Sequence, residues 1–357
     1  MLTPGAKYDQ ITIPGIGGGA ESTSATVIGD VTIHDERADQ DFPTHWLVAH
    51  EAAHQWWGDL VTMRDWTHAW IHEGFATYYE NVYLAASRGD DEAAVDWLLK
   101  RDLYLREART RYQRPIVNAR WEFPDQIFDR HSYQKAALVI RLLRYVLGDA
   151  AYRCAITHFF QKHAFRFADT QDLLVANRES TGQVLDGFFD AWLYKPGHPV
   201  LSVESRWLEA EKVLEIRVAQ TQESGGQPEV FPMPLRFGIA TASGKRIERV
   251  WMQQRQQTYR FAVDARPMLV SSRPRMPSQW DRQRSHQSRE QLERALNKLA
   301  VFRAVSRQPR TILMNYCICA DSVDIAWNYN QDTQSDFAGQ LPEFERLEKR
   351  AFTAAGG

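Results

Sequence analysis

The spacing of apolar residues changes at one point in the chain, and this change constrains the fold more than any other feature. From about residue 42 to 195, apolar residues recur every three or four positions, as on the buried face of a helix. From 196 to about 275 they alternate with polar residues, as in a strand with one buried face. The segment KPGHP at 195–199 marks the boundary. The chain is therefore predicted to be a multidomain α+β protein.

The first part is predicted to be mainly helical, and the second to be a small antiparallel β-sandwich. Helices are expected over 44–58, 70–87, 92–109, 132–148 and 169–182. Strands are expected within 213–222, 234–244 and 259–270. After residue 276 the sequence is polar and charged, with one amphipathic helix predicted at 291–305 and an irregular tail. The predicted domains are 1–195, 196–275 and 276–357.

Composition argues against several classes of protein. A formal net charge of −2 over 357 residues indicates no large basic surface for nucleic acid or an anionic membrane. No stretch reaches the roughly 18 apolar residues of a membrane span, and the N-terminal sequence lacks the basic and apolar regions of an export signal. The three cysteines, an odd number, argue against a disulfide framework. We therefore expect a cytoplasmic protein that acts on small molecules or peptides.

The segment HEAAHQWWGD carries a metal-binding pattern. Residues four apart on a helix lie on one face, so His50 and His54 can bind the same ion. Neutral imidazole is a good zinc ligand, and Glu51 is placed to act on a water in an open coordination position. Glu73 follows His54 after 18 residues, early on the next predicted helix, and supplies a third ligand. Glu80 lies nearly on the same face as Glu73 and is expected to hydrogen-bond a ligand histidine.

The same residues also have simpler interpretations. HExxH arises by chance in ordinary helices, and the alternative for Glu80 is a solvated position on a helix surface. His34, His45 and His68 lie near the site in sequence but are interpreted as polar surface or satisfied core groups. The metal site thus depends on the combined spacing of its residues rather than on HExxH alone.

Three segments together resemble the M1 family of zinc aminopeptidases. The first is HEAAHQWWGD, followed after 18 residues by the glutamate of WIHEGFA. Upstream, GGGAESTSATVIGD at 17–30 resembles the family's GxMEN exopeptidase motif. Downstream, FDRHSYQKAALVIRLLRYVLGD at 128–149 resembles its YxKG segment with the catalytic tyrosine. The resemblance covers about residues 8–275.

The chain departs from the family pattern at a few positions. Ala20 and Ser22 stand where the exopeptidase motif usually has methionine and asparagine. Ala136 stands where the tyrosine motif usually has glycine, and His72 replaces a common asparagine. These differences affect the surroundings of the site, while the chemically active positions of both motifs are retained.

The resemblance implies a thermolysin-like (gluzincin) catalytic domain that binds one Zn²⁺ and removes N-terminal residues from peptides. In this domain Glu51 is the general base, and the Tyr133 hydroxyl shares the developing oxyanion with the metal. Glu21 pairs with the free α-ammonium group of the substrate. Flanking glycines allow the backbone to approach a peptide closely. The predicted substrate-binding loop comprises Gly18, Gly19, Ala20 and Glu21.

The M1 family also places a large β domain and several strands ahead of the exopeptidase motif. In this chain the motif lies within 22 residues of Met1, so a further N-terminal region or a partner chain is expected to cover the active-site helices. Two alternative functions stay open. One is a catalytically impaired fragment that binds zinc or peptide, and the other is an endopeptidase, which would follow if Ala20 and Ser22 signal a lost exopeptidase site.

Overall fold

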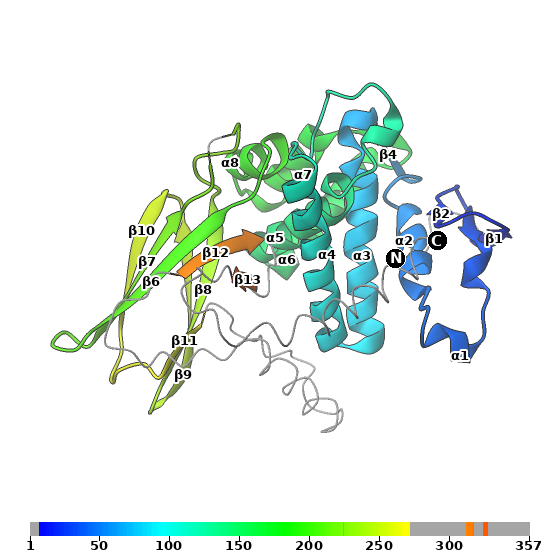
Figure 1. The fold of residues 1–357 in the computed structure, drawn as a ribbon. Helices are drawn as coiled ribbons and strands as arrows, with labels where there is room; N and C mark the ends of the chain where they lie inside the picture. Colours follow the sequence, from blue (N-terminus) through cyan, green and yellow to red (C-terminus); the bar gives the residue numbers. More distant parts are fainter. Residues whose placement is uncertain (1–6, 224, 272–311, 318–323, 328–357) are drawn as a thin grey trace.

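The computed structural model describes residues 7–223, 225–271, 312–317 and 324–327 of the chain (Figure 1). Helices dominate the first part of this region, and strands dominate the later part. The predicted mixture of helix and sheet is therefore confirmed. The division into three domains stays a prediction.

The longer helices of the first part lie together in space (Figure 1). Their bounds are α2 (His45–His54), α3 (Trp70–Arg88), α4 (Asp90–Thr110), α5 (Ala136–Leu147), α6 (Asp149–His163) and α7 (Thr170–Thr181). Two short helices are α1 (Glu36–Asp39) and α8 (Asp186–Phe189). Each predicted helix of this part has a counterpart in the structure. The sequence prediction omits α6, in which polar residues interrupt the apolar pattern.

Local sequence explains where the helices begin and end. Asp169 starts α7 with a capping box, in which each of Asp169 and Asp172 accepts the backbone N–H of the other. Gly182 follows α7 with a φ of 70°, in the left-handed region that favours glycine. Helix α2 ends before the predicted stop at Gly58, whose φ of 141° belongs to the loop that follows the helix.

Helix α3 forms the centre of the helical part, because α2, α4 and α5 all pack against it. Trp57 stacks on Phe75 of α3 with 3.5 Å between ring centroids, and it also stacks with Phe159 of α6. These rings are almost completely buried. Burial of apolar area stabilises a fold by about 25 cal/mol per Å², so this aromatic cluster makes α3 a firm support for the polar side chains that it carries.

Two small sheets flank the helices. In the first, β3 (Ala25–Gly29) lies between β1 (Asp9–Ile13), to which it is parallel, and β2 (Gly19–Ala20), to which it is antiparallel. In the second, β4 (Val61–Met63) is parallel to β5 (Arg166–Ala168). Helix α2 contacts β2 and β3, so the glycine-rich loop lies against the helix that carries the HExxH segment.

The later part forms two larger sheets. One has the strand order β10-β7-β6-β12-β13 and contains β6 (Val200–Leu208), β7 (Val213–Gln220) and β10 (Gln256–Ala262). The other has the order β11-β8-β9, with β8 (Met233–Thr241), β9 (Gly244–Met252) and β11 (Leu269–Ser271). The ring of Phe237 in β8 lies 5.8 Å from that of Tyr259 and 6.0 Å from that of Phe261, both in β10. The sheets therefore contact each other, while the sandwich as a whole stays a prediction.

Two strands correct the prediction of a helical or irregular segment over 276–357. Strand β12 (Ile312–Cys317) pairs antiparallel with β6, and β13 (Asp324–Trp327) pairs with β12. Such short apolar runs are ambiguous between helix and strand, and their pairing partner lies far away in sequence. The helix predicted at 291–305 lies outside the described residues.

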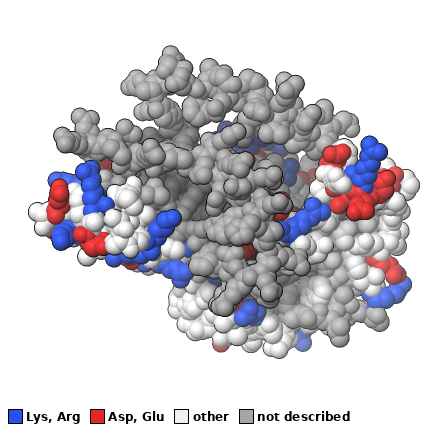
Figure 2. Space-filling view, turned by 90° about the horizontal axis from the view of Figure 1, so that it is seen from below, with Lys and Arg blue, Asp and Glu red and all other residues white. Residues whose placement is uncertain are grey.

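The surface carries charges of both signs. In the view of Figure 2, basic and acidic side chains lie side by side on the described part of this face, in agreement with the nearly balanced net charge of −2. Among the helices that the structure describes, none is long and apolar enough to cross a bilayer.

The KPGHP segment joins the helical part to the sheets and is held by α4. The Tyr104 hydroxyl lies 3.3 Å from the Gly197 carbonyl oxygen and 3.1 Å from Nδ1 of His198. The side chains of Tyr104 and His198 are both buried. Burial, reinforced by the positive charge of Lys135, lowers the pKa of His198 to about 3.

We predict that His198 makes the fold sensitive to mild acid. Its folded pKa lies below the unfolded value of about 6.5, so below that pH the unfolded chain takes up a proton that the folded chain does not. The contribution of this group to the free energy of unfolding should fall by about 2 kcal/mol between pH 7 and pH 5. In His198→Asn, denaturant unfolding at the two pH values should show a correspondingly smaller loss. An equal loss in both proteins would contradict this prediction.

Helix α3 and the π-helical turn η4 (His131–Lys135) meet at Gly74. A methyl group at this position would lie 2.6 Å from Cβ of Ala136 and 3.2 Å from the Ser132 carbonyl oxygen. Carbon atoms in contact prefer a separation of about 3.5–4.0 Å, so a side chain at position 74 would force the two elements apart.

We predict that Gly74→Ala destabilises the protein by about 1–3 kcal/mol through overpacking, although alanine favours helices over glycine by about 1 kcal/mol. In the Ala136→Gly background the same substitution should cost less, because the shorter of the two clashes is removed. Unfolding of the wild type, both single variants and the double variant would measure this coupling. Additive effects of the two substitutions would refute the proposed contact.

Candidate metal centre and active site

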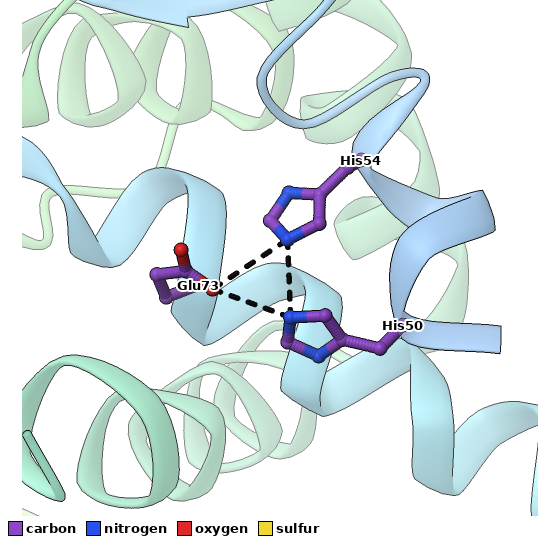
Figure 3. A group of neighbouring side chains, drawn as sticks. All are labelled: His50, His54 and Glu73. Atoms are coloured by element: carbon purple, nitrogen blue, oxygen red, sulfur yellow. Dashed lines mark hydrogen bonds and ion pairs between the residues drawn. The ribbon is translucent and has the colours of Figure 1, made fainter. Parts of the chain in front are cut away.

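Three side chains predicted as metal ligands converge between α2 and α3 (Figure 3). Nε2 of His50 lies 3.0 Å from Nε2 of His54 and 3.2 Å from Oε2 of Glu73. Nε2 of His54 lies 3.5 Å from the same oxygen. All three residues are buried. The spacing along two helices thus brings two ring nitrogens and one carboxylate oxygen to one point.

The hydrogen bond that Nδ1 makes in each ring shows which of the two ring nitrogens carries the proton. Nδ1 of His54 lies 2.9 Å from the Trp57 carbonyl oxygen, which can only accept, so this Nδ1 must donate. Nδ1 of His50 lies 2.6 Å from a carboxylate oxygen of Glu80 and donates to it. In the neutral rings both Nε2 atoms then present lone pairs toward each other and toward Glu73.

Three acceptors at 3.0–3.5 Å repel one another unless a positive charge lies among them. A proton is one solution: although burial disfavours a charged ring, Glu73 and Glu80 raise the pKa of His50 to about 10. A divalent cation is the other solution. Two imidazoles and one carboxylate are the donor set that zinc accepts, so the residues fit this metal.

Glu80 belongs to a chain of paired charges, in which Glu80 and Lys100 are buried and Asp96 is partly buried. Its second carboxylate oxygen lies 2.9 Å from Nζ of Lys100, which lies 2.7 Å from a carboxylate oxygen of Asp96. The Asp96 carboxylate also accepts a hydrogen bond from the Asn81 amide. Although burial opposes ionisation, the Lys100 charge and the bond to His50 lower the pKa of Glu80. Glu80 therefore stays ionised as an acceptor for His50.

Glu51 lies beside these residues and faces the glycine-rich loop. Burial raises the pKa of its carboxyl to about 7. Its Oε2 is buried and has no hydrogen-bond partner among the described residues. A Cβ on Gly19 would lie 2.3 Å from Oε1 of Glu51, so the loop backbone approaches the carboxylate as closely as glycine allows.

Glu21 reaches the same region from the loop. Carboxylate oxygens of Glu21 and Glu51 and a ring nitrogen of His54 lie within 4.8 Å of one another. Nε2 of His72 accepts the Met63 backbone N–H at 2.8 Å, so Nδ1 carries the ring proton and lies 3.7 Å from Oε1 of Glu21. Although burial favours the neutral acid, this contact and the nearby His54 lower the pKa of Glu21.

The other predicted loop residues lie next to Glu21. Gly19 and Ala20 form β2, which pairs with β3. Gly18 has a φ of 101°, and its carbonyl oxygen accepts the Gly29 N–H at 2.9 Å. The loop is thus tied to β3 on one side and approaches Glu51 on the other.

Tyr133 lies across the site on η4. Its ring is nearly parallel to the His50 ring, with 6.0 Å between centroids and 10° between planes. Burial and the carboxylates of Glu73, Glu21 and Glu51 raise the pKa of Tyr133 well above its usual range. The phenol therefore keeps its proton near neutral pH.

Two residues near the site have no role in the sequence prediction. His72 is noted there only as a replacement for asparagine, yet its ring lies beside Glu21. Lys100 carries one local signal, a lysine within the apolar run WLLK of a predicted helix. His34, His45 and His68 belong to none of the groups of potential metal ligands formed by the described residues.

Comparison with known proteins gives a consistent result. A family model described as "Peptidase family M1 domain" matches residues 4–192, more than half of the chain. Aminopeptidase M1-A of Oryza sativa subsp. japonica is 34% identical over 239 residues, which cover 63% of this chain and 26% of that protein. Aminopeptidase M1 of Arabidopsis thaliana is 33% identical over 252 residues, which cover 66% of this chain and 27% of that protein. The chain thus spans about a quarter of the length of these relatives.

A solved structure shows a similar fold. Aminopeptidase A of Legionella pneumophila, crystallised with aspartic acid, matches with a TM-score of 0.59 at 20% sequence identity. The match covers 71% of this chain and 29% of that one. At this identity the likeness concerns the fold, whereas the family model concerns the sequence itself. The membership predicted from the three segments of the sequence is therefore confirmed: the chain belongs to peptidase family M1.

Proposed function

We propose that the chain carries the catalytic centre of a zinc-dependent aminopeptidase, which removes residues from peptides with a free N-terminus. The observation that supports this most strongly is the convergence of three acceptor atoms from His50, His54 and Glu73. Their mutual repulsion favours a bound cation, and Glu51 and Glu21 lie beside them.

A zinc ion held by His50, His54 and Glu73 would supply a Lewis acid and lower the pKa of a bound water to about 7. Glu51 takes the proton of the attacking water and delivers it to the leaving amine. Burial raises the pKa of this carboxyl, which favours uptake of the proton compared with an exposed glutamate. Gly19 keeps the loop backbone close to this carboxylate.

Tyr133 and Glu21 act on the two ends of the substrate's N-terminal residue, its carbonyl group and its amino group. The protonated Tyr133 hydroxyl donates a hydrogen bond to the oxygen that becomes negative when water attacks the carbonyl. Glu21, ionised and oriented by His72, pairs with the α-ammonium group of the substrate. This pairing limits cleavage to the first peptide bond, as expected of an exopeptidase.

We predict that the metal-free chain binds close to one equivalent of Zn²⁺ and that His54→Ala abolishes this binding. Glu80→Gln should weaken it by about 10–100-fold, because His50 then loses its ionised acceptor. Titration against a competing chelator would measure both effects. Glu92→Gln, at an exposed position in the first turn of α4, is the matched control and should bind as the wild type does. Equal affinity of Glu80→Gln and the control would contradict the role of Glu80.

We predict that the chain releases a chromophore from an aminoacyl anilide and that Glu51→Gln lowers kcat by at least about 10²-fold with unchanged zinc content. The amide keeps the size of the side chain but cannot accept the proton. The same anilide with an acetylated amino group should be cleaved far more slowly, because Glu21 then lacks its ammonium partner.

Each failure of this experiment has a separate meaning. Equal cleavage of the free and acetylated substrates would support a metal-dependent endopeptidase. Zinc binding without turnover would support a catalytically impaired fragment. Near-native activity of Glu51→Gln would show that the proposed base is wrong.

A further inference from the structure

Tyr133 lies on an element that is not a regular α-helix. It lies on the π-helical turn η4, between an irregular segment and the regular helix α5. π-Helical geometry is rare and appears mostly as single turns, frequently at functional sites. Contacts from outside the turn must therefore hold it in this form.

Asp129 provides such contacts from just ahead of the turn. Its Oδ1 accepts the backbone N–H groups of His131 at 2.9 Å and Ser132 at 3.1 Å. Its own carbonyl oxygen accepts the N–H of Tyr133 at 3.2 Å. Asp129 thus binds the first N–H groups of η4, which have no partner within the turn.

Arg114 fixes the Asp129 carboxylate in turn. Its Nε and Nη2 donate to the two carboxylate oxygens at 2.8 and 2.6 Å, the paired geometry of a strong ion pair. Nη2 also lies 2.9 Å from the Ser132 hydroxyl oxygen, inside the turn itself. Nη1 donates to the carbonyl oxygens of Pro115 and Ile116, and Nη2 also lies 3.1 Å from that of Ile127. The guanidinium therefore links residues 115–116 to residues 127–132, where the turn begins.

Two further groups complete the cluster. The Tyr112 hydroxyl donates to Oδ2 of Asp129 at 2.9 Å, and Nδ1 of His131 lies 3.2 Å from Oε2 of Glu107. The carboxylates of Glu107 and Asp129 with His131 have the spacing of a metal site. Arg114 already supplies a positive charge to both oxygens of Asp129, so the guanidinium takes the place that a metal ion would have in this cluster.

We propose that Asp129 and Arg114 are positioning residues that act through Tyr133. The inference rests on the proposed function, in which the Tyr133 hydroxyl stabilises the oxyanion. The pair fixes the start of η4, while Gly74 of α3 packs against Ala136, which directly follows the turn. Between these two anchors the Tyr133 ring is held parallel to that of His50. A displacement of about 1 Å in such a group can cost on the order of 10²-fold in rate.

The ion pair should work across a wide pH range. Although burial opposes ionisation, His131 and Arg114 hold the pKa of Asp129 well below its usual range. The carboxylate therefore remains charged wherever the peptidase reaction is expected to run.

Asp129→Asn tests the proposal with little change of shape. The amide can keep Oδ1 as acceptor for the backbone of η4, but it loses the charge and the acceptor that Arg114 Nε and Tyr112 use. We expect kcat for the aminoacyl anilide to fall by about 10–100-fold, with KM within about threefold and zinc content unchanged. Asp125→Asn, at an exposed position in the short 3-10 helix η3 (Pro124–Gln126), is the matched control and should keep wild-type kcat. Wild-type kcat in folded Asp129→Asn would overturn the proposal.

A double-variant cycle separates positioning from general destabilisation. If Asp129 acts through the Tyr133 hydroxyl, Asp129→Asn should have almost no further effect on kcat in the Tyr133→Phe background. Equal fold-losses in both backgrounds would show that Asp129 acts by another route and would overturn the proposal. Should Asp129→Asn fail to fold, Arg114→Lys, which cannot form the paired contact, is tested in the same cycle.

Hydrogen exchange gives a readout that does not depend on activity. In the metal-free and metal-loaded chain, Asp129→Ala, which removes the Oδ1 acceptor, should speed exchange of the His131 and Ser132 amides by about tenfold or more, while amides of α3 keep their rates. Unchanged exchange at these amides would overturn the proposal. An inactive wild type would instead refute the proposed function, and the exchange rates would still decide whether Asp129 holds the turn.

Discussion

The convergence of three acceptor atoms is the constraint on which the rest of the site depends. His50 and His54 each donate a proton from Nδ1, to Glu80 and to the Trp57 carbonyl, so each Nε2 presents a lone pair toward Glu73. In a buried position this repulsion is costly unless a cation or a proton compensates it. Although burial disfavours a charged ring, the carboxylates of Glu73 and Glu80 favour positive charge at this point and raise the pKa of His50. A metal ion would supply that charge with the correct donor set.

The surroundings hold this arrangement by pairing buried charges. Glu80 lies between His50 and Lys100, and Lys100 lies between Glu80 and Asp96. On the other side of the site, Arg114 and Asp129 form a second pair near Tyr133. Breaking one partner of such a pair leaves an uncompensated buried charge, which costs about 3–5 kcal/mol. The same pairing that makes these charges tolerable also fixes the direction of each functional side chain.

Close backbone contacts also hold the site together. Gly19 brings the loop of β2 against Glu51, and Gly74 lets α3 approach η4 next to Ala136. These two contacts join three segments that carry the proposed amine-binding, metal-binding and oxyanion-binding groups. The alanine at 136 replaces the glycine usual in the family motif, and the absence of a side chain at Gly74 accommodates its methyl group. The small residues at these positions thus let the segments that carry the proposed metal ligands and Tyr133 lie close together.

The sequence by itself determined most of the longer helices, the switch to strands after residue 195 and the set of candidate ligands. A helix repeats every 3.6 residues, so the four-residue spacing of His50 and His54 is enough to predict that they lie on the same face of the helix. The partners of these residues were decided only by the tertiary structure. No periodicity in the sequence predicts three of these contacts, which are Lys100 with Glu80, Arg114 with Asp129 and strand β12 with β6. Such contacts form between segments distant in the chain, where packing and charge compensation select the partner.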